Sequence, residues 1–356
     1  MKNLVLTAAA IATALILSAC GGGGGGGDGS ATSGTTVGAG TTGSTTGTAG
    51  TTGGTTGGTT TPAATDPGIA VVALAAPNYT VADCARFTND AAAVAALDLS
   101  NTTIKQINDY LQAVDADHAY KVFIRRPYDF ANWIASLGGS VNFLSLGIAT
   151  HETLHMTDSV LRLCAPAGYK TLFLGNIVDT GLQGGDTAST RIVDTMIDTA
   201  LKPEPRFATY ITGAAAGNDF TVLLDEFAAY AGAARTTTQA HALGKLALPS
   251  GSLDSDLGGT VNFMVFLETY LKAARLNNAA TYDTIRTSAA TKAAIQTIWT
   301  AAEKALVDSY PLVKAGSLTV NTAYFSAAYS GALLSELDAI GISHATTASW
   351  SGTYLP

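Results

Sequence analysis

From about Asn78 onward, apolar residues recur along the chain mainly with a helical period. Ile104, Ile107, Leu111 and Val114 share one face of a predicted helix. The stretch 141–163 is a longer apolar segment with the same period, and it begins directly after a Gly-Gly-Ser sequence. Further helices are predicted at residues 188–201, 218–234, 258–275 and 287–307.

Two segments have the β-branched and aromatic composition of strands instead. Residues 120–126 end at Pro127, which suits the end of a strand, and residues 169–178 form the second segment. Short strands followed by runs of helices are typical of the α+β class. The predicted fold is therefore α+β, mainly helical with a small sheet, in a single domain of residues 78–356.

The first 19 residues are typical of a secretory signal peptide. Lys2 precedes an apolar run from Leu4 to Leu17 that is too short to span a bilayer comfortably. The run ends in Leu-Ser-Ala-Cys20, which resembles the bacterial lipobox and implies cleavage before Cys20 and lipidation of its thiol. The alternative is an ordinary signal peptide that ends near a cysteine. Because Gly21 rather than Asp follows Cys20, the resemblance favours the outer membrane of the bacterial cell envelope, facing the periplasm or the outside.

Residues 20–77 form the lipidated cysteine and a tether. Up to about Thr61 they are almost entirely Gly, Thr, Ser and Ala, and they continue with an Ala/Pro-rich approach to the domain. Such a stretch buries too little apolar surface to offset its conformational entropy, so we expect it to be disordered. It either lifts the domain off the membrane or is a spacer without a selected length.

The charge balance excludes one class of function. The chain has 27 Asp and Glu residues against 19 Lys and Arg residues. A protein that binds nucleic acid through its phosphates needs a basic face, so we expect no nucleic-acid partner. Only six of the acids are glutamates, which narrows the choice of metal ligands: Glu152, Glu204, Glu226, Glu268, Glu303 and Glu336.

Three cysteines are present in the sequence, and lipidation would consume Cys20. The remaining even pair, Cys84 and Cys164, predicts a disulfide in an oxidising compartment. Two buried free thiols are the alternative. A disulfide there would hold the end of the helix predicted at 141–163.

One motif in that helix carries chemistry, His151-Glu152-Thr153-Leu154-His155. Residues four apart lie on the same face of a helix, so both imidazoles can reach one zinc ion. Glu152 is rotated by about 100° from His151, so it can contact a zinc-bound water without being a ligand. We expect Glu152 to accept the proton of that water and to deliver it later to the leaving amine.

A catalytic zinc ion needs a third protein ligand. Glu226 lies in a predicted apolar helix, where a lone carboxylate is costly without a partner. Glu268 has similar surroundings and is the second choice, while His241 and His344 are weaker candidates. Of the remaining glutamates, Glu204 falls in a proline-flanked loop. The other two are expected on exposed helix faces: Glu303 and Glu336.

Three further residues lie at helical spacing from these ligands. Tyr230 shares the face of Glu226 and could donate a hydrogen bond to a developing oxyanion, although it could equally be a core tyrosine. Asp158 and Asp225 could orient an imidazole, although we expect both to be solvated.

His-Glu-Thr-Leu-His followed roughly 70 residues later by Asp-Glu-Phe-Ala-Ala-Tyr resembles the gluzincin-type zinc metallopeptidases. The resemblance implies a zincin-like fold, in which the active-site helix packs under a small sheet. It also implies a Zn²⁺ cofactor bound by His151, His155 and Glu226, and a peptide or protein substrate. The expected function is that of a membrane-tethered zinc metallopeptidase. The alternative is a non-catalytic lipoprotein that binds or scaffolds a partner and has a degenerate zinc site or none.

Overall fold

The computed structural model describes residues 64–165, 169–213, 217–248, 253–254 and 256–354. Contacts divide the chain after Pro62, and the fold is that of the unit Ala63–Pro356. The predicted signal peptide, Cys20 and most of the predicted tether lie outside the described residues.

The described fold is mainly helical, as predicted. The first half contains η1 (Val81–Asp83), α2 (Cys84–Thr88), α3 (Asp90–Ala95), α4 (Thr102–Val114), α5 (Ala119–Arg125), α6 (Pro127–Ser136) and α7 (Phe143–Cys164). Short turns follow at η2 (Thr190–Thr195), η3 (Thr199–Leu201), α8 (Pro205–Phe207) and the π-helical η4 (Ala208–Thr212). The second half contains α9 (Phe220–Ala242), α10 (Asp256–Asn277), α11 (Ala279–Thr287), α12 (Ala289–Lys314), α13 (Thr322–Ala328), α14 (Gly331–Ile340) and η6 (Thr347–Trp350).

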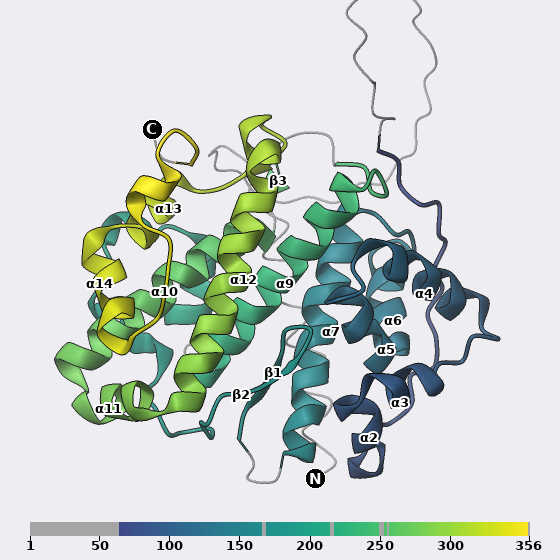
Figure 1. Ribbon diagram of the computed structural model, residues 1–356, viewed down its shortest axis with the longest axis horizontal. Helices are drawn as coiled ribbons and strands as arrows, with labels where there is room; N and C mark the ends of the chain where they lie inside the picture. The colour runs from purple at the N-terminus through teal and green to yellow at the C-terminus, as the bar shows by residue number, and fades with distance from the viewer. Residues whose placement is uncertain (1–63, 166–168, 214–216, 249–252, 255, 355–356) are drawn as a thin grey trace, which may run out of the picture. The chain divides into compact units, whose positions relative to one another are not determined.

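Helix α9 lies at the centre of the unit and packs against α7, α10 and α12 (Figure 1). Its small residues, among them Ala228, Ala231 and Gly232, are buried and allow neighbouring helices to approach closely. At Gly232 the approach is tightest, since an added Cβ atom would meet the ring of His118. The central helices are thus held at short range, which fixes the side chains that point between α7 and α9.

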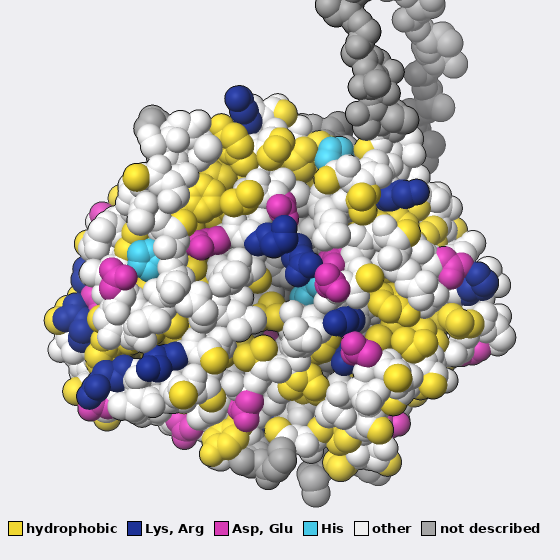
Figure 2. All heavy atoms as spheres, in the orientation of Figure 1, with side chains coloured by type: hydrophobic (Ala, Val, Ile, Leu, Met, Phe, Trp, Pro, Cys, Tyr) yellow, Lys and Arg dark blue, Asp and Glu magenta, His cyan; other side chains and the backbone are white. Residues whose placement is uncertain are grey.

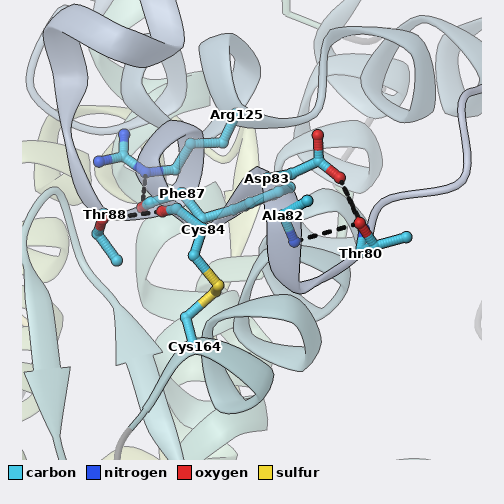
Figure 3. Close-up of a disulfide and its surroundings, with 8 residues drawn as sticks. All are labelled: Thr80, Ala82, Asp83, Cys84, Phe87, Thr88, Arg125 and Cys164. Carbon is cyan, nitrogen blue, oxygen red and sulfur yellow. Dashed lines mark hydrogen bonds between the residues drawn. A yellow bond between two sulfur atoms is a disulfide. The ribbon is translucent and has the colours of Figure 1, made fainter.

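Helix α7 begins and ends at well-defined points. Asn142 and Ser145 form a capping box at its start, where the Asn142 side chain accepts from the Ser145 N–H. At its end, Cys164 forms a disulfide with Cys84 of α2 (Figure 3). The predicted disulfide is therefore confirmed, and it ties the end of α7 to α2 near the start of the domain.

The described strands form two separate two-stranded sheets, one antiparallel and one parallel. Strands β1 (Thr171–Phe173) and β2 (Ile177–Asp179) pair antiparallel, so the single strand predicted at 169–178 is a hairpin. Gly175 turns it with a positive φ of 81°. Strand β1 packs on α7 and α9, and β2 packs on α12. A second, parallel pair joins β3 (Leu253–Asp254) to β4 (Leu318–Thr319).

Two secondary-structure predictions are wrong. The strand predicted at 120–126 is the helix α5, whose buried residues Ala119, Val122 and Phe123 have helical spacing. Its β-branched composition is overridden by packing against α4 and α7. The helix predicted at 188–201 is instead the two short 3₁₀ turns η2 and η3, because the side chains of Ser189 and Asp198 cap each turn separately.

The helices predicted at 218–234, 258–275 and 287–307 are present as α9, α10 and α12, and each extends further at its C-terminal end. Within the described part of the chain, no helix is both long enough and apolar enough to cross a membrane.

Candidate metal centre

Two of the three predicted ligands come from adjacent turns of α7. His151 and His155 point from the same face of the helix, and their Nε2 atoms lie 3.2 Å apart. His151 is buried, with 7% of its surface exposed, and His155 is half-buried. Between the two histidines and just beyond them the helix is largely buried, and Thr157 Oγ1 donates to the Thr153 carbonyl.

The third predicted ligand comes from the central helix. Glu226 on α9 places Oε2 3.6 Å from His151 Nε2 and 3.5 Å from His155 Nε2. These three atoms form the only group of its kind among the described residues, and they all lie within 4.8 Å of one another. The structure therefore brings together the residues that the motif and the helix composition singled out.

The triangle of ligand atoms fits a metal ion. Ligand atoms about 2.0–2.1 Å from a tetrahedral zinc ion are about 3.3 Å apart, close to the three separations found between His151, His155 and Glu226. Oε2 of Glu226 is buried and has no hydrogen-bond partner in the described part of the chain. A buried, unpaired carboxylate oxygen facing two imidazole nitrogens is a donor set suited to a divalent cation.

Carboxylates face the other nitrogen of each imidazole. Asp225 Oδ1 lies 3.0 Å from His155 Nδ1, and Asp256 Oδ1 at the start of α10 lies 3.9 Å from His151 Nδ1. A carboxylate at Nδ1 fixes the tautomer and the ring orientation, and it leaves Nε2 free to bind a metal. The expectation that Asp225 and Asp158 are solvated is wrong, because both side chains are buried in this packing.

The pKa values of three groups in this cluster are shifted by their neighbours. Burial alone would lower the pKa of His155, but Glu226 and Asp225 raise that pKa well above its ordinary value. Burial alone would raise the pKa of Glu226, but His155 and His151 lower it to about 2. The pKa of Asp225 is lowered too, because Lys170 and His155 outweigh burial. Both carboxylates are thus held in the ionised form, which is the form that binds or orients a metal ligand.

Glu152 lies next to the three ligands without joining them. It is half-buried, and no hydrogen bond or ion pair links its carboxylate to another described residue. Its side chain leaves α7 on the face adjacent to that of His151. Glu152 is therefore not one of the ligand residues, and its carboxylate is not engaged by another described side chain.

Two tyrosines and an arginine border the centre. The Tyr230 ring packs against the His151 ring with centroids 4.5 Å apart, and its hydroxyl lies 3.3 Å from the Tyr210 hydroxyl. The Arg206 guanidinium lies over the Tyr230 ring, 5.4 Å from its centroid. Burial raises the pKa of Tyr230 to about 12, and burial together with Glu226 raises that of Tyr210 well above its ordinary value. Both phenols therefore stay protonated and can donate hydrogen bonds.

The other candidates do not reach the centre. Glu268, the second choice for a ligand, is completely buried in α10. Its charged neighbours are the carboxylates of Glu336 and Glu303, which repel a negative charge on it. His241 Nδ1 bonds the carbonyl of Leu246, and His344 pairs with Asp338. The expected exposure of the last two glutamates is wrong. Glu336 is buried against Arg275, and Glu303 is half-buried and bonds Trp299.

Sequence reasoning did not identify Lys170 or Asp256, and it gave no reason to favour Tyr210. Lys170 lies just before β1, Asp256 begins α10, and Tyr210 lies in η4. None has a fixed spacing from the motif, so no pattern in the sequence connects them to it. Figure 2 shows acidic, basic and histidine side chains gathered around a shallow hollow near the middle of one face.

No protein-family model matches the chain, and the comparisons with curated proteins and with solved structures found no match either. What relates this chain to known proteins is therefore the site itself. Its His151, His155 and Glu226 are arranged consistently with a metal site of the His-Glu-x-x-His type.

Proposed function

We propose that this protein is a zinc-dependent metallopeptidase with a zincin-like fold. The proposal depends on one observation, the convergence of His151 Nε2, His155 Nε2 and Glu226 Oε2 at mutual distances of 3.2–3.6 Å. Two imidazoles and one carboxylate are a common ligand set of catalytic zinc in peptidases. Zinc bound there would supply Lewis-acid chemistry, since it acidifies water and polarises a carbonyl group.

The chain's own residues supply the remaining functions. Glu152 has no partner among the described residues, so its carboxylate can take a proton from the attacking water and pass it to the departing amine nitrogen. The Tyr230 phenol, held against His151, can donate a hydrogen bond to the oxyanion that develops on the substrate. Asp225 accepts a hydrogen bond from His155 Nδ1 and keeps that imidazole oriented, and Asp256 places a carboxylate 3.9 Å from His151 Nδ1.

Metal analysis of purified variants tests the metal centre. The wild-type protein is expected to contain one zinc ion per chain by elemental analysis. His151→Ala and Glu226→Ala should lose that ion, whereas Glu268→Ala should retain it, because Glu268 lies in α10 outside the ligand group. A wild-type protein that binds no zinc, or a Glu226→Ala variant that keeps it, would contradict the proposal.

A mixture of peptides incubated with the zinc-loaded protein tests the reaction class. New N-termini should appear and should be absent with the His151→Ala variant. Full zinc occupancy without cleavage of any peptide would instead favour a non-catalytic binding module.

The proposal includes a lipid anchor at Cys20 and a position at the bacterial outer membrane. It is supported by the Leu-Ser-Ala-Cys sequence and by Gly21 directly after it. Acyl chains on Cys20 would hold the protein on the membrane without a spanning helix. Cys20→Ala should move the protein to the soluble fraction. A variant that stays with membranes after a carbonate wash would contradict the anchor.

A further inference from the structure

Lys170 reaches the metal centre from a fixed point of the backbone. Its N–H donates to the carbonyl of Leu182, and its own carbonyl accepts from the N–H and the hydroxyl of Thr180 at 3.0 and 2.7 Å. These bonds close the base of the β1–β2 hairpin, which begins at the next residue. A lysine side chain loses much rotamer freedom when it is ordered, so a fixed backbone lowers the cost of holding its ammonium in one place.

The ammonium of Lys170 donates a hydrogen bond to the second carboxylate oxygen of Asp225. Its Nζ lies 2.5 Å from Asp225 Oδ2, while Asp225 Oδ1 faces His155 Nδ1. The side chains of Lys170 and Asp225 are 14% and 10% exposed, so their charges interact at low effective dielectric. Both oxygens of Asp225 are thereby engaged, which prevents the carboxylate from turning away from His155.

A second carboxyl group makes this cation more important. Asp158 lies one turn beyond His155 on α7 and is completely buried, and its oxygens have no hydrogen-bond partner within the described part of the chain. It interacts electrostatically with both Asp225 and Lys170. Without the ammonium, the second oxygen of Asp225 would have no basic partner, and the carboxylate would lie beside Asp158 and His155 alone.

We infer that Lys170 is a positioning residue of the metal centre, which fixes Asp225 so that Asp225 directs His155 Nε2 at the metal. The inference rests on the proposed function, because it assumes that a metal binds at His151, His155 and Glu226. It connects the hairpin to the metal: the base of β1 sets the position of Lys170, Lys170 sets Asp225, and Asp225 sets the imidazole.

Zinc affinity of the full-length protein provides the test, measured by competition with a chelator of known affinity. Lys170→Met removes the charge and keeps the side-chain volume. We expect its zinc dissociation constant to rise by about tenfold or more, in the range found for changes behind a metal ligand. Lys170→Arg keeps a cation and should restore most of the affinity.

Lys121→Met is the matched control. Lys121 holds the tip of the same hairpin through the Gly175 carbonyl and pairs with Asp90, but it does not touch the metal centre. The Lys121→Met variant should have a lower free energy of unfolding but the same zinc affinity as the wild type. If both variants weaken zinc binding equally, the effect is a general loosening of the hairpin and the inference is wrong.

A double-mutant cycle separates positioning from simple stabilisation. Because Lys170 acts through Asp225, Lys170→Met should have little further effect on zinc affinity in an Asp225→Asn background. With cobalt in place of zinc, the visible absorption spectra of Lys170→Met and Asp225→Asn should both differ from that of the wild type. If Lys170→Met does not fold, Lys170→Gln takes its place in the cycle.

The possible outcomes separate the two proposals. A wild-type protein without zinc binding overturns the proposed function and, with it, the role of Lys170. Normal zinc binding in the wild type together with a dissociation constant within twofold in Lys170→Met overturns the role of Lys170 alone. If Lys170→Met and Asp225→Asn reduce zinc affinity additively in the double variant, the role of Lys170 through Asp225 is also overturned.

Discussion

Oε2 of Glu226 on α9 lies 3.5 Å from Nε2 of His155 on α7, although the two residues are far apart in the sequence. The contact exists because α7 and α9 pack against each other. Small residues on α9 bring the helices close enough for a short glutamate side chain to reach two imidazoles. The candidate metal centre thus depends on the packing of α9 against α7.

Glu152→Gln tests the assignment of the general base. The amide is nearly isosteric with the carboxylate but cannot accept the proton of the attacking water. We expect the zinc content and the melting temperature to stay unchanged, while kcat for peptide cleavage falls by about 10²–10⁴-fold. His151→Ala, by contrast, should lose zinc as well as activity. A Glu152→Gln variant with zinc bound and near wild-type turnover would falsify this assignment.

Tyr230→Phe tests the oxyanion donor. The change removes the hydroxyl and keeps the ring that packs against His151. If the phenol donates to the reacting carbonyl, kcat should fall by about 10²-fold with little change in KM. Tyr210→Phe is the matched control, since it removes the neighbouring hydroxyl at 3.3 Å. An equal and small effect of both changes would show that Tyr230 is a core residue with its tip hydrogen-bonded elsewhere.

The sequence predicted those site residues that stand at a fixed spacing in a helix or whose charge would be costly to bury without a partner. His151 and His155 share a face at any helix register, and Glu226 stood out because a lone acid in an apolar helix needs a partner. The disulfide followed from the even number of cysteines that remain after Cys20.

The remaining features depend on tertiary packing. Lys170 contacts Asp225 from the base of a hairpin, and Asp256 faces His151 from the first residue of α10. No local pattern in the sequence encodes either approach. The prediction of a strand at 120–126 is wrong for a related reason. These β-branched residues form helix α5, because the segment packs against other helices. Glu268 illustrates the same limit: its burial was expected, but its neighbours are acids instead of a metal.

The disulfide between Cys84 and Cys164 closes a loop with a sequence separation of 80 residues. In a chain with Cys20→Ser, reduction should lower the free energy of unfolding by about 4–5 kcal/mol, because the open chain gains conformational entropy when it unfolds. Urea unfolding of the oxidised and reduced forms measures the difference. The reduced form should keep its zinc under native conditions, since Cys164 lies more than two turns beyond His155. Equal unfolding midpoints would contradict the expected stabilisation.

Glu268 makes stability depend on pH. It is completely buried, and burial together with Glu336 and Glu303 raises its pKa well above the ordinary 4.5. Above pH 4.5 the unfolded chain releases this proton while the folded chain keeps it, so the folded state binds more protons. Stability contributed by Glu268 is therefore fully present below pH 4.5 and is lost as the pH rises towards the raised pKa, by about 1.4 kcal/mol per pH unit.

Glu268→Gln removes this titration, because the amide stays neutral at every pH. Relative to the wild type, the variant should become steadily more stable between pH 5 and pH 8 in urea unfolding experiments. Glu336→Gln is the matched control: it breaks a pair with Arg275 and should destabilise the protein at both pH values. If the stability difference between Glu268→Gln and the wild type is the same at pH 5 and pH 8, the carboxyl group of Glu268 titrates alike in the folded and unfolded chains, and its raised pKa is refuted.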